Sequence, residues 1–212
     1  MMHQKQIETL ARFVPVVAAE HVAGLISSNR MHLNISRARR SKLGDFRPAR
    51  QGGLHRISVN ANLNVYAFLL VFLHELAHLL VWEKHKNKVA PHGDQWKDQF
   101  GFLIREHLAL GHFHPALHQL LEEMSQKPKA AGLGHEGLTR ALALFDKESE
   151  NAHGVFLEEL PAESVFQASN GRMFRKEERL RKRYRCLCLE TNKRYLFHPM
   201  AKVMKCETES YL

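Results

Sequence analysis

An almost wholly apolar segment from Val65 to Trp82 is the strongest feature of the hydrophobic pattern. A continuous apolar run of this length predicts a helix that is buried on most of its sides. Hydropathy alone would also allow a membrane span, but His74, Glu75 and His78 would then lie near its middle without water. We therefore predict a buried core helix in a protein that does not associate with a membrane.

Apolar residues recur at helical spacing in three other parts of the chain. Residues 4–27 predict a helical flank that Pro15 breaks or kinks. A second helix is predicted to begin near Asp94, which can cap it. Its core-facing stripe consists of Trp96, Phe100, Leu103 and Ile104. A third helix is predicted at 115–124, where a proline occupies the first turn.

The pattern changes after residue 126. Residues 126–134 contain one proline and two glycines and predict a linker, and 138–145 predict one more short helix. Apolar and polar residues then alternate as they do in strands. The alternating segments are 155–160, 165–168, 184–189 and 194–198. Residues 190–193 predict the turn of a hairpin between the last two segments.

These elements divide the chain into three parts. Residues 1–126 are predicted to form the core domain with its N-terminal helical flank, and 127–154 form a linker with a short helix. Residues 155–212 are predicted to form a small, basic module rich in β-hairpins. A length of 212 residues with 44% hydrophobic content suits one sizeable globular core and a small appendage.

The apolar helix carries the candidate chemistry. His74 and His78 are four residues apart and share one helical face, and Glu75 projects beside them. Two imidazoles and a carboxylate on one face suit a zinc site, in which three protein ligands leave a position for water that the glutamate can deprotonate. A third ligand must therefore come from another part of the chain.

Two arrangements for the third ligand can be compared. The extended pattern HExxHxxGxxH would need a glycine where the chain has Val81 and a histidine where it has Lys84, so that arrangement is excluded. Pro91, His92 and Gly93 instead form a sequence that favours a tight loop before the next helix. Such a loop can return His92 to the first helix, and we predict that His92 is the third ligand.

The combination of HExxH with a following Pro-His-Gly-x-x-Trp resembles the SprT-like zinc metallopeptidases, whose relatives include the Spartan proteases. The resemblance implies that His74, His78 and His92 bind Zn²⁺ and that Glu75 is the general base. It also implies an α+β fold with a zincin-like core, in which the HExxH helix packs against a small β-sheet. The family's strand pair would be residues 31–38 and 54–60, with a basic linker at 39–51 between them.

The sequence therefore predicts a zinc-dependent endopeptidase with a protein substrate. The resemblance further implies substrates that are associated with DNA. The alternative is a nucleic-acid-binding protein whose zinc site is structural or inactive. Glu75 favours the enzyme, because a structural site normally fills all four positions and needs no base.

The positive charge is concentrated in two segments. The net charge is +9, and residues 172–185 alone contain eight Arg or Lys and two Glu. A second basic cluster lies within residues 37–50. Both segments are candidates to contact DNA phosphates, with a solvated basic face as an equally weighted alternative.

Three cysteines are too few for a disulfide framework, and no export signal opens the chain, so we expect a cytoplasmic protein. A second metal site remains open as a minor alternative. Its ligands would be Cys186, Cys188, His198 and Cys206. Four histidines near the second and third helices are minor candidates for substrate contacts or oxyanion stabilisation. These are His107, His112, His114 and His118.

Overall fold

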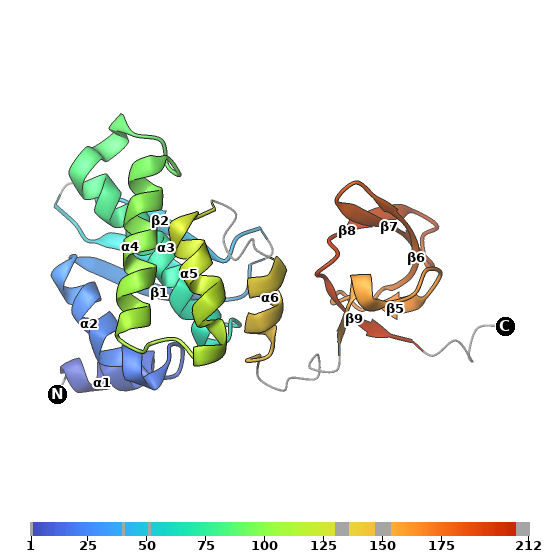
Figure 1. Ribbon diagram of the computed structural model, residues 1–212, viewed down its shortest axis with the longest axis horizontal. Coiled ribbons are helices and arrows are strands. Elements are labelled where there is room, and N and C mark those ends of the chain that lie inside the picture. Colours follow the sequence, from blue (N-terminus) through green and yellow to red (C-terminus); the bar gives the residue numbers. More distant parts are fainter. Residues whose placement is uncertain (1, 40, 51, 130–135, 147–153, 207–212) are drawn as a thin grey trace. The chain divides into compact units, whose positions relative to one another are not determined.

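The computed structural model describes residues 2–39, 41–50, 52–129, 136–146 and 154–206. The chain divides into two compact units, residues 1–145 and residues 146–212. The first unit combines helices with a three-stranded sheet, and the second is built mainly from strands (Figure 1). This confirms the predicted α+β class.

The sheet of the first unit has the strand order β1-β3-β2. Strands β1 (Met31–Ser36) and β3 (His55–Asn60) are the predicted pair, and they run parallel to each other. Strand β2 (Gly44–Arg47) lies antiparallel on the other side of β3, inside the segment that was predicted to be a linker. Only four residues pair here, and they lack a β-branched run, so the pattern alone does not reveal the strand.

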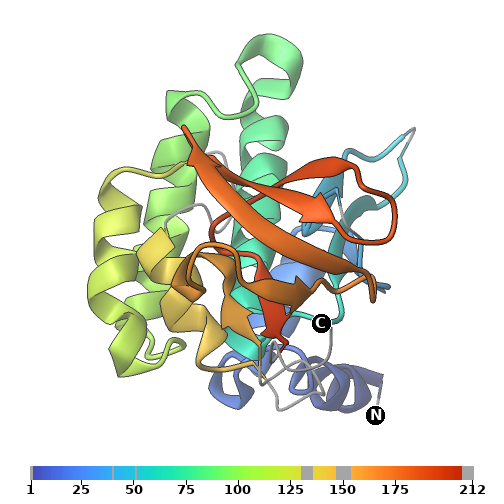
Figure 2. The ribbon, with the colours of Figure 1, turned by 90° about the vertical axis from the view of Figure 1, so that its right-hand side faces the viewer.

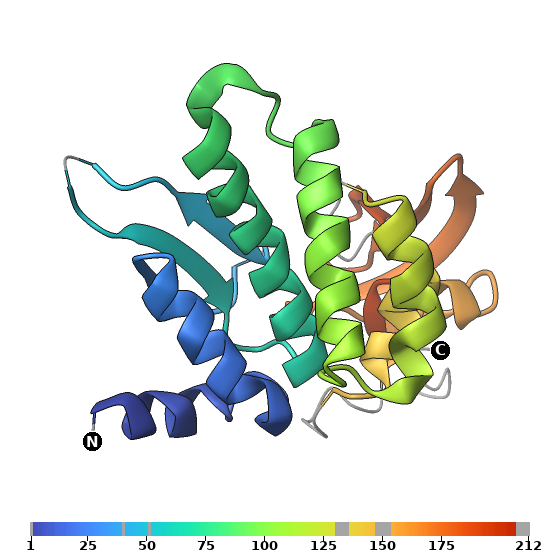
Figure 3. The ribbon, with the colours of Figure 1, turned by 60° about the vertical axis from the view of Figure 1, so that its left-hand side comes forward.

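Helix α3 (Val65–His85) packs between this sheet and helix α4 (Asp94–Ala109), as Figure 3 shows. It begins where the Asn64 side chain accepts a hydrogen bond from the backbone N–H of Ala67 at 2.9 Å. By length and composition α3 could cross a membrane, but 67% of its most apolar window is buried within the protein. Its apolar residues form the centre of the core of this unit.

The predicted N-terminal helix is divided into α1 (Met2–Leu10) and α2 (Ala19–Ser28), with the 3₁₀ turn η1 (Val16–Ala18) after Pro15. One predicted detail is wrong: Gly93 is the N-cap of α4, and Asp94 lies in its first turn. A short 3₁₀ turn, η2 (Lys86–Lys88), follows α3.

The first unit ends with three short helical elements. These are η3 (Pro115–Leu117), α5 (His118–Gln126) and α6 (Glu136–Ala143). The predicted domain boundary at residue 126 differs from the structure, in which the first unit extends to Phe145. Leu138 and Leu142 of α6 are buried in the same core as α3, and this burial makes α6 part of the first unit.

The second unit is a six-stranded sheet with the order β4-β9-β5-β6-β7-β8, in which neighbouring strands run antiparallel. Figure 2 shows β6 as its longest strand, beside β7 and β8. The strands are β4 (Val155–Phe156), β5 (Val165–Gln167), β6 (Met173–Leu180), β7 (Arg183–Cys188), β8 (Arg194–Phe197) and β9 (Lys202–Lys205). A 3₁₀ turn, η4 (Leu157–Glu159), occupies part of the predicted first strand.

Strands β6 and β9 were not predicted. The sequence of β6 is dominated by charged residues, and its strand character comes from pairing with β5 on one side and β7 on the other. Phe174 on β6 and Val203 on β9 are buried in the core of this unit, beside Cys186 and Cys188. Pairing with neighbouring strands therefore decides the conformation of segments whose own composition favours solvent.

Candidate metal centre

Helix α3 presents His74 and His78 on one face, one turn apart, as the spacing predicts. The side chains of His74 and Glu75 are each only 8% exposed. Polar groups at such depth need partners, because an unpaired polar group in an apolar core is strongly unfavourable. The partners of these side chains must therefore come from another segment of the chain.

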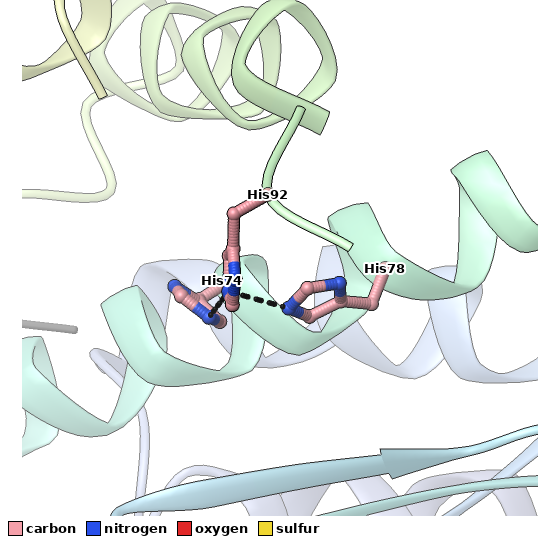
Figure 4. Close-up of side chains that lie close together, drawn as sticks. All are labelled: His74, His78 and His92. Atoms are coloured by element: carbon pink, nitrogen blue, oxygen red, sulfur yellow. Dashed lines mark hydrogen bonds between the residues drawn. The ribbon is translucent and has the colours of Figure 1, made fainter. Parts of the chain in front are cut away.

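His92 stands opposite, on the loop between η2 and α4. The backbone N–H of Gly93 donates to the carbonyl of Ala90 at 3.0 Å, and this turn directs His92 toward α3. Its Nε2 atom lies 3.1 Å from Nε2 of His78 and 3.4 Å from Nε2 of His74 (Figure 4). All three predicted ligands thus point the same atom at one position.

The spacing of these nitrogens suits a tetrahedral metal ion. Ligand bonds of about 2.0–2.1 Å at tetrahedral angles place two nitrogens about 3.3 Å apart. Three imidazole Nε2 atoms cannot all satisfy one another by hydrogen bonding when each is neutral, since each neutral ring has a single N–H. The donor set therefore fits a zinc ion, held by His74, His78 and His92.

Burial keeps these rings neutral. Burial, together with the smaller effect of the neighbouring histidines, lowers the pKa of His74 to about 3 and that of His78 to about 4. Burial also lowers the pKa of His92. Neutral imidazole is the form that binds a metal, so the three lone pairs are available at neutral pH.

Trp96 forms the apolar wall behind the three histidines. Its side chain is completely buried, and its ring centroid lies 4.7 Å from those of His74 and His92 and 5.3 Å from that of His78. The indole N–H donates to the backbone carbonyl of His74 at 3.4 Å. These contacts of Trp96 hold α4 against the HExxH turn.

Glu75 lies against strand β2. Burial, aided by the negative charge of Asp45, raises the pKa of Glu75 to about 7, while Arg39, Lys42 and the backbone N–H of Phe46 act in the opposite direction. A carboxyl group with a pKa near the working pH is suited to accept and return a proton. The position of Glu75 and its raised pKa both depend on β2, a strand that the sequence pattern did not predict.

Gly44 of β2 permits this close approach. A Cβ atom at this position would lie 2.5 Å from Oε1 of Glu75 and 2.7 Å from Cγ1 of Val71, which is closer than real Cβ contacts. Any other residue would push the strand away from the helix. The signal in the sequence was a glycine next to Asp45 and Phe46 within a basic stretch, which is too weak to predict the contact.

A cavity of about 720 Å³ opens over the histidines and Glu75. Its walls come from residues 41–46 around β2, from α3, and from the loop that carries His92. A pocket of this volume is within the range of small-molecule and peptide side-chain sites. The cluster is therefore accessible from solvent on the side where the fourth metal position would lie.

The model of the SprT-like family matches residues 13–103. This segment is SprT-like. No curated protein and no solved structure matches the chain significantly. The SprT-like segment contains all four predicted site residues, and its family indicates a metallopeptidase-like, metal-dependent function.

The four histidines that were minor candidates for substrate contacts or oxyanion stabilisation lie away from the three-histidine cluster. Nδ1 of His114 accepts a hydrogen bond from the N–H of Ala116, and Nε2 of His118 lies 3.2 Å from the carbonyl of Phe113, so both rings hold the loop before α5. His107 and His112 are buried together at the far end of α4. None of these four histidines lines the cavity beside Glu75.

The cysteine set is not assembled into a metal site. Among the described residues, the clusters able to hold an ion do not include Cys186, Cys188, His198 or Cys206. Burial raises the pKa of Cys186 to about 11, which keeps its thiol protonated at neutral pH. All three cysteines are free thiols.

Proposed function

We propose that this chain is a zinc-dependent endopeptidase with a zincin-like core, in which His74, His78 and His92 hold the ion and Glu75 is the general base. The observation that carries the proposal is the convergence of three neutral imidazole Nε2 atoms beside a buried carboxyl group at the floor of an open cavity. A purely structural site would be closed and would have no use for such a base.

The residues divide the chemistry between them. When bound, Zn²⁺ would act as a Lewis acid and lower the pKa of water toward about 7. Glu75, held in place by β2, would take the proton onto its carboxylate and then deliver it to the amine of the leaving group. Trp96 excludes water from one side of the histidines and strengthens the electrostatic interactions there.

Strand β2 supports a peptide as the substrate. In the described part of the chain β2 pairs with β3 alone, so its second edge is free, and residues 44–46 line the cavity. An extended peptide can add to such an edge through backbone hydrogen bonds. That binding mode would lay a scissile bond across the position between the histidines and Glu75.

The substitution Glu75→Gln tests the proposal directly. Glutamine keeps the size of the side chain but cannot accept the proton, so cleavage of casein or histone should fall by about 10²–10⁴-fold while bound zinc is retained. Glu83→Gln is the matched control, because Glu83 lies on the same helix with half of its side chain exposed and outside the cavity. Unchanged cleavage by Glu75→Gln would reject the proposed mechanism.

We further propose that the protein acts in the cytoplasm on proteins bound to DNA. The basic segment at 172–185 supports this through the exposed hairpin turn of Arg181, Lys182 and Arg183. The segment at 37–50 supports it less, since Arg39 donates to the Asn60 side chain at 2.8 Å and is therefore occupied.

Replacing Arg181, Lys182 and Arg183 together by glutamine should weaken DNA binding and reduce its dependence on salt, because fewer counterions are released. Fluorescence anisotropy at several salt concentrations measures both effects. Equal affinity and an equal salt slope would reject this role. DNA binding by a protein that hydrolyses no peptide would instead favour a nucleic-acid-binding protein with an inactive zinc site.

A further inference from the structure

A second group of histidines lies in the interior of the first unit, separate from the cavity. The ring centroids of His21, His107 and His112 are 5.0 Å, 5.3 Å and 5.1 Å apart, so the three rings form a nearly equilateral triangle. His107 is fully buried and His112 is 5% exposed. His21 is half-buried, and three imidazoles grouped in this way are unusual in a core that is otherwise aliphatic and aromatic.

The backbone positions two of these rings through the end of α4. His107 lies in its last turn, and Gly111 then adopts the left-handed conformation with φ of 68°. The N–H of Gly111 donates to the carbonyl of Leu108, and the N–H of His112 donates to the carbonyl of His107, both at 3.0 Å. This pair of bonds is a Schellman motif, which folds His112 back beside His107. Helix α2 contributes His21 from its first turn, and this ring lies beside those of His107 and His112.

The three rings leave nitrogen atoms without partners. Nε2 of His21, Nε2 of His107 and Nδ1 of His112 are all buried and have no hydrogen-bond partner among the described residues. Buried polar side-chain atoms in folded proteins nearly always have a partner, and one that lacks it is destabilising by about 1–3 kcal/mol. Three such atoms in one cluster indicate that a common partner belongs between them.

The hydrogen bonding of His107 indicates the nature of this partner. Its Nδ1 lies 3.0 Å from the carbonyl of Leu103, an acceptor, so Nδ1 carries the proton and Nε2 presents a lone pair to the cluster. Metal-bound histidines typically donate their other ring N–H to such an acceptor, which orients the ring. Burial lowers the pKa of His107 to about 4, so the ring is neutral at physiological pH.

We propose that His21, Glu106 and His107 form a second metal site beside His112, which takes a divalent transition ion such as Zn²⁺ and serves to hold α2 against the end of α4. Imidazole nitrogens are ligands that zinc prefers among biological cations. The carboxylate of Glu106 supplies the third donor, because His21, Glu106 and His107 can bring one ligand atom each within 4.8 Å of the others.

This site is distinct from the candidate metal centre. His107 is eleven residues beyond Trp96 on α4, about 16 Å along the helix axis. Its residues do not line the cavity over Glu75. The proposal does not depend on the endopeptidase function, and an inactive protein would bind the second ion equally well.

Metal stoichiometry in variants of the full chain tests the second site. Protein loaded with Zn²⁺ and freed of excess should contain about two ions in the wild type and about one in either His92→Ala or His21→Gln. The double variant should contain almost none. Glutamine at position 21 keeps a polar group near the place of Nε2 and preserves the volume of the side chain. The proposal is overturned if His21→Gln binds as much zinc as the wild type while His92→Ala binds none.

Cobalt gives an independent measurement that does not use activity. In the His92→Ala background, added Co²⁺ should produce the intense visible absorption of a tetrahedral ion, and His21→Gln or His107→Asn should remove it. Circular dichroism checks that the variants are folded. If the glutamine variant does not fold, the asparagine variant is measured in its place. Weak absorption, as for an octahedral ion in water, would mean that buried water alone fills the cluster and would overturn the proposal.

Discussion

The two histidine clusters of the first unit use the same side chain in opposite surroundings. His74, His78 and His92 face a cavity and stand beside a carboxyl group with a raised pKa, whereas His107 and His112 are buried and His21 is half-buried, away from that cavity. The ligand type is therefore not what separates a reactive site from a structural one. Access to solvent and the presence of a base decide the chemistry.

The two clusters also differ in what holds them. The first is supported by β2 and Trp96, which fix Glu75 and the HExxH turn. The second is supported by the Schellman motif at Gly111 and by the hydrogen bond between His107 and Leu103. Substitutions that disturb the first cluster should lower the rate of catalysis. Substitutions that disturb the second cluster should lower the stability of the fold.

Among the substitutions that test this comparison between the two clusters, Gly44→Ala is expected to have the largest effect. The new methyl group would collide with Glu75 and Val71, and displacing a catalytic group by about 1 Å can cost about 10²-fold in rate. We expect kcat for casein cleavage to fall by about this factor with zinc content unchanged. Gly24→Ala is the matched control, because a Cβ atom there has no neighbour within 4 Å. Wild-type kcat in Gly44→Ala would show that β2 does not position Glu75.

A smaller effect, on stability, is expected from His21→Gln. An ion present at about 100 times its Kd stabilises the native state by about 2.7 kcal/mol, which corresponds to about 5–10 °C in Tm for a chain of this size. In the His92→Ala background, zinc should raise Tm, and the added His21→Gln change should remove that increase. His32→Gln, at an exposed position of β1, is the control. A zinc-dependent Tm that persists without His21 would assign the ion to another place.

The smallest effect is expected from Asp45→Asn, measured on the pH dependence of kcat/KM. Glu75 acts as a base only when ionised, so the rate falls as the pH falls through its pKa. Asp45 raises this pKa, and its neutralisation should move the acidic limb to lower pH by a fraction of a unit. Lys42→Gln should move it to higher pH, because Lys42 lowers the same pKa. Shifts in the same direction would contradict the assigned base.

Much of the first cluster could be predicted because its geometry is local. A helical repeat of 3.6 residues places His74 and His78 on one face, and a proline and a glycine around His92 favour the returning loop. The contribution of Gly44 was missed, since its role depends on a strand that exists only by pairing with β3.

The second cluster could be predicted only in part. The spacing of His107, Gly111 and His112 is local and is compatible with a helix that ends in a Schellman motif. The partner His21 lies 86 positions earlier in the chain, on a helix whose approach is set by core packing. No pattern within either segment contains that information.

By itself the sequence determined the apolar helix, the HExxH pair, the loop of His92 and the likeness to the SprT-like family. These features follow from short-range periodicity and turn chemistry, which depend on neighbouring residues alone. The tertiary structure decided the rest, including the position of β2 over Glu75, the raised pKa of that carboxyl group and the enclosure of the second cluster. These depend on burial and on contacts between distant segments, and such contacts form only when the whole core packs.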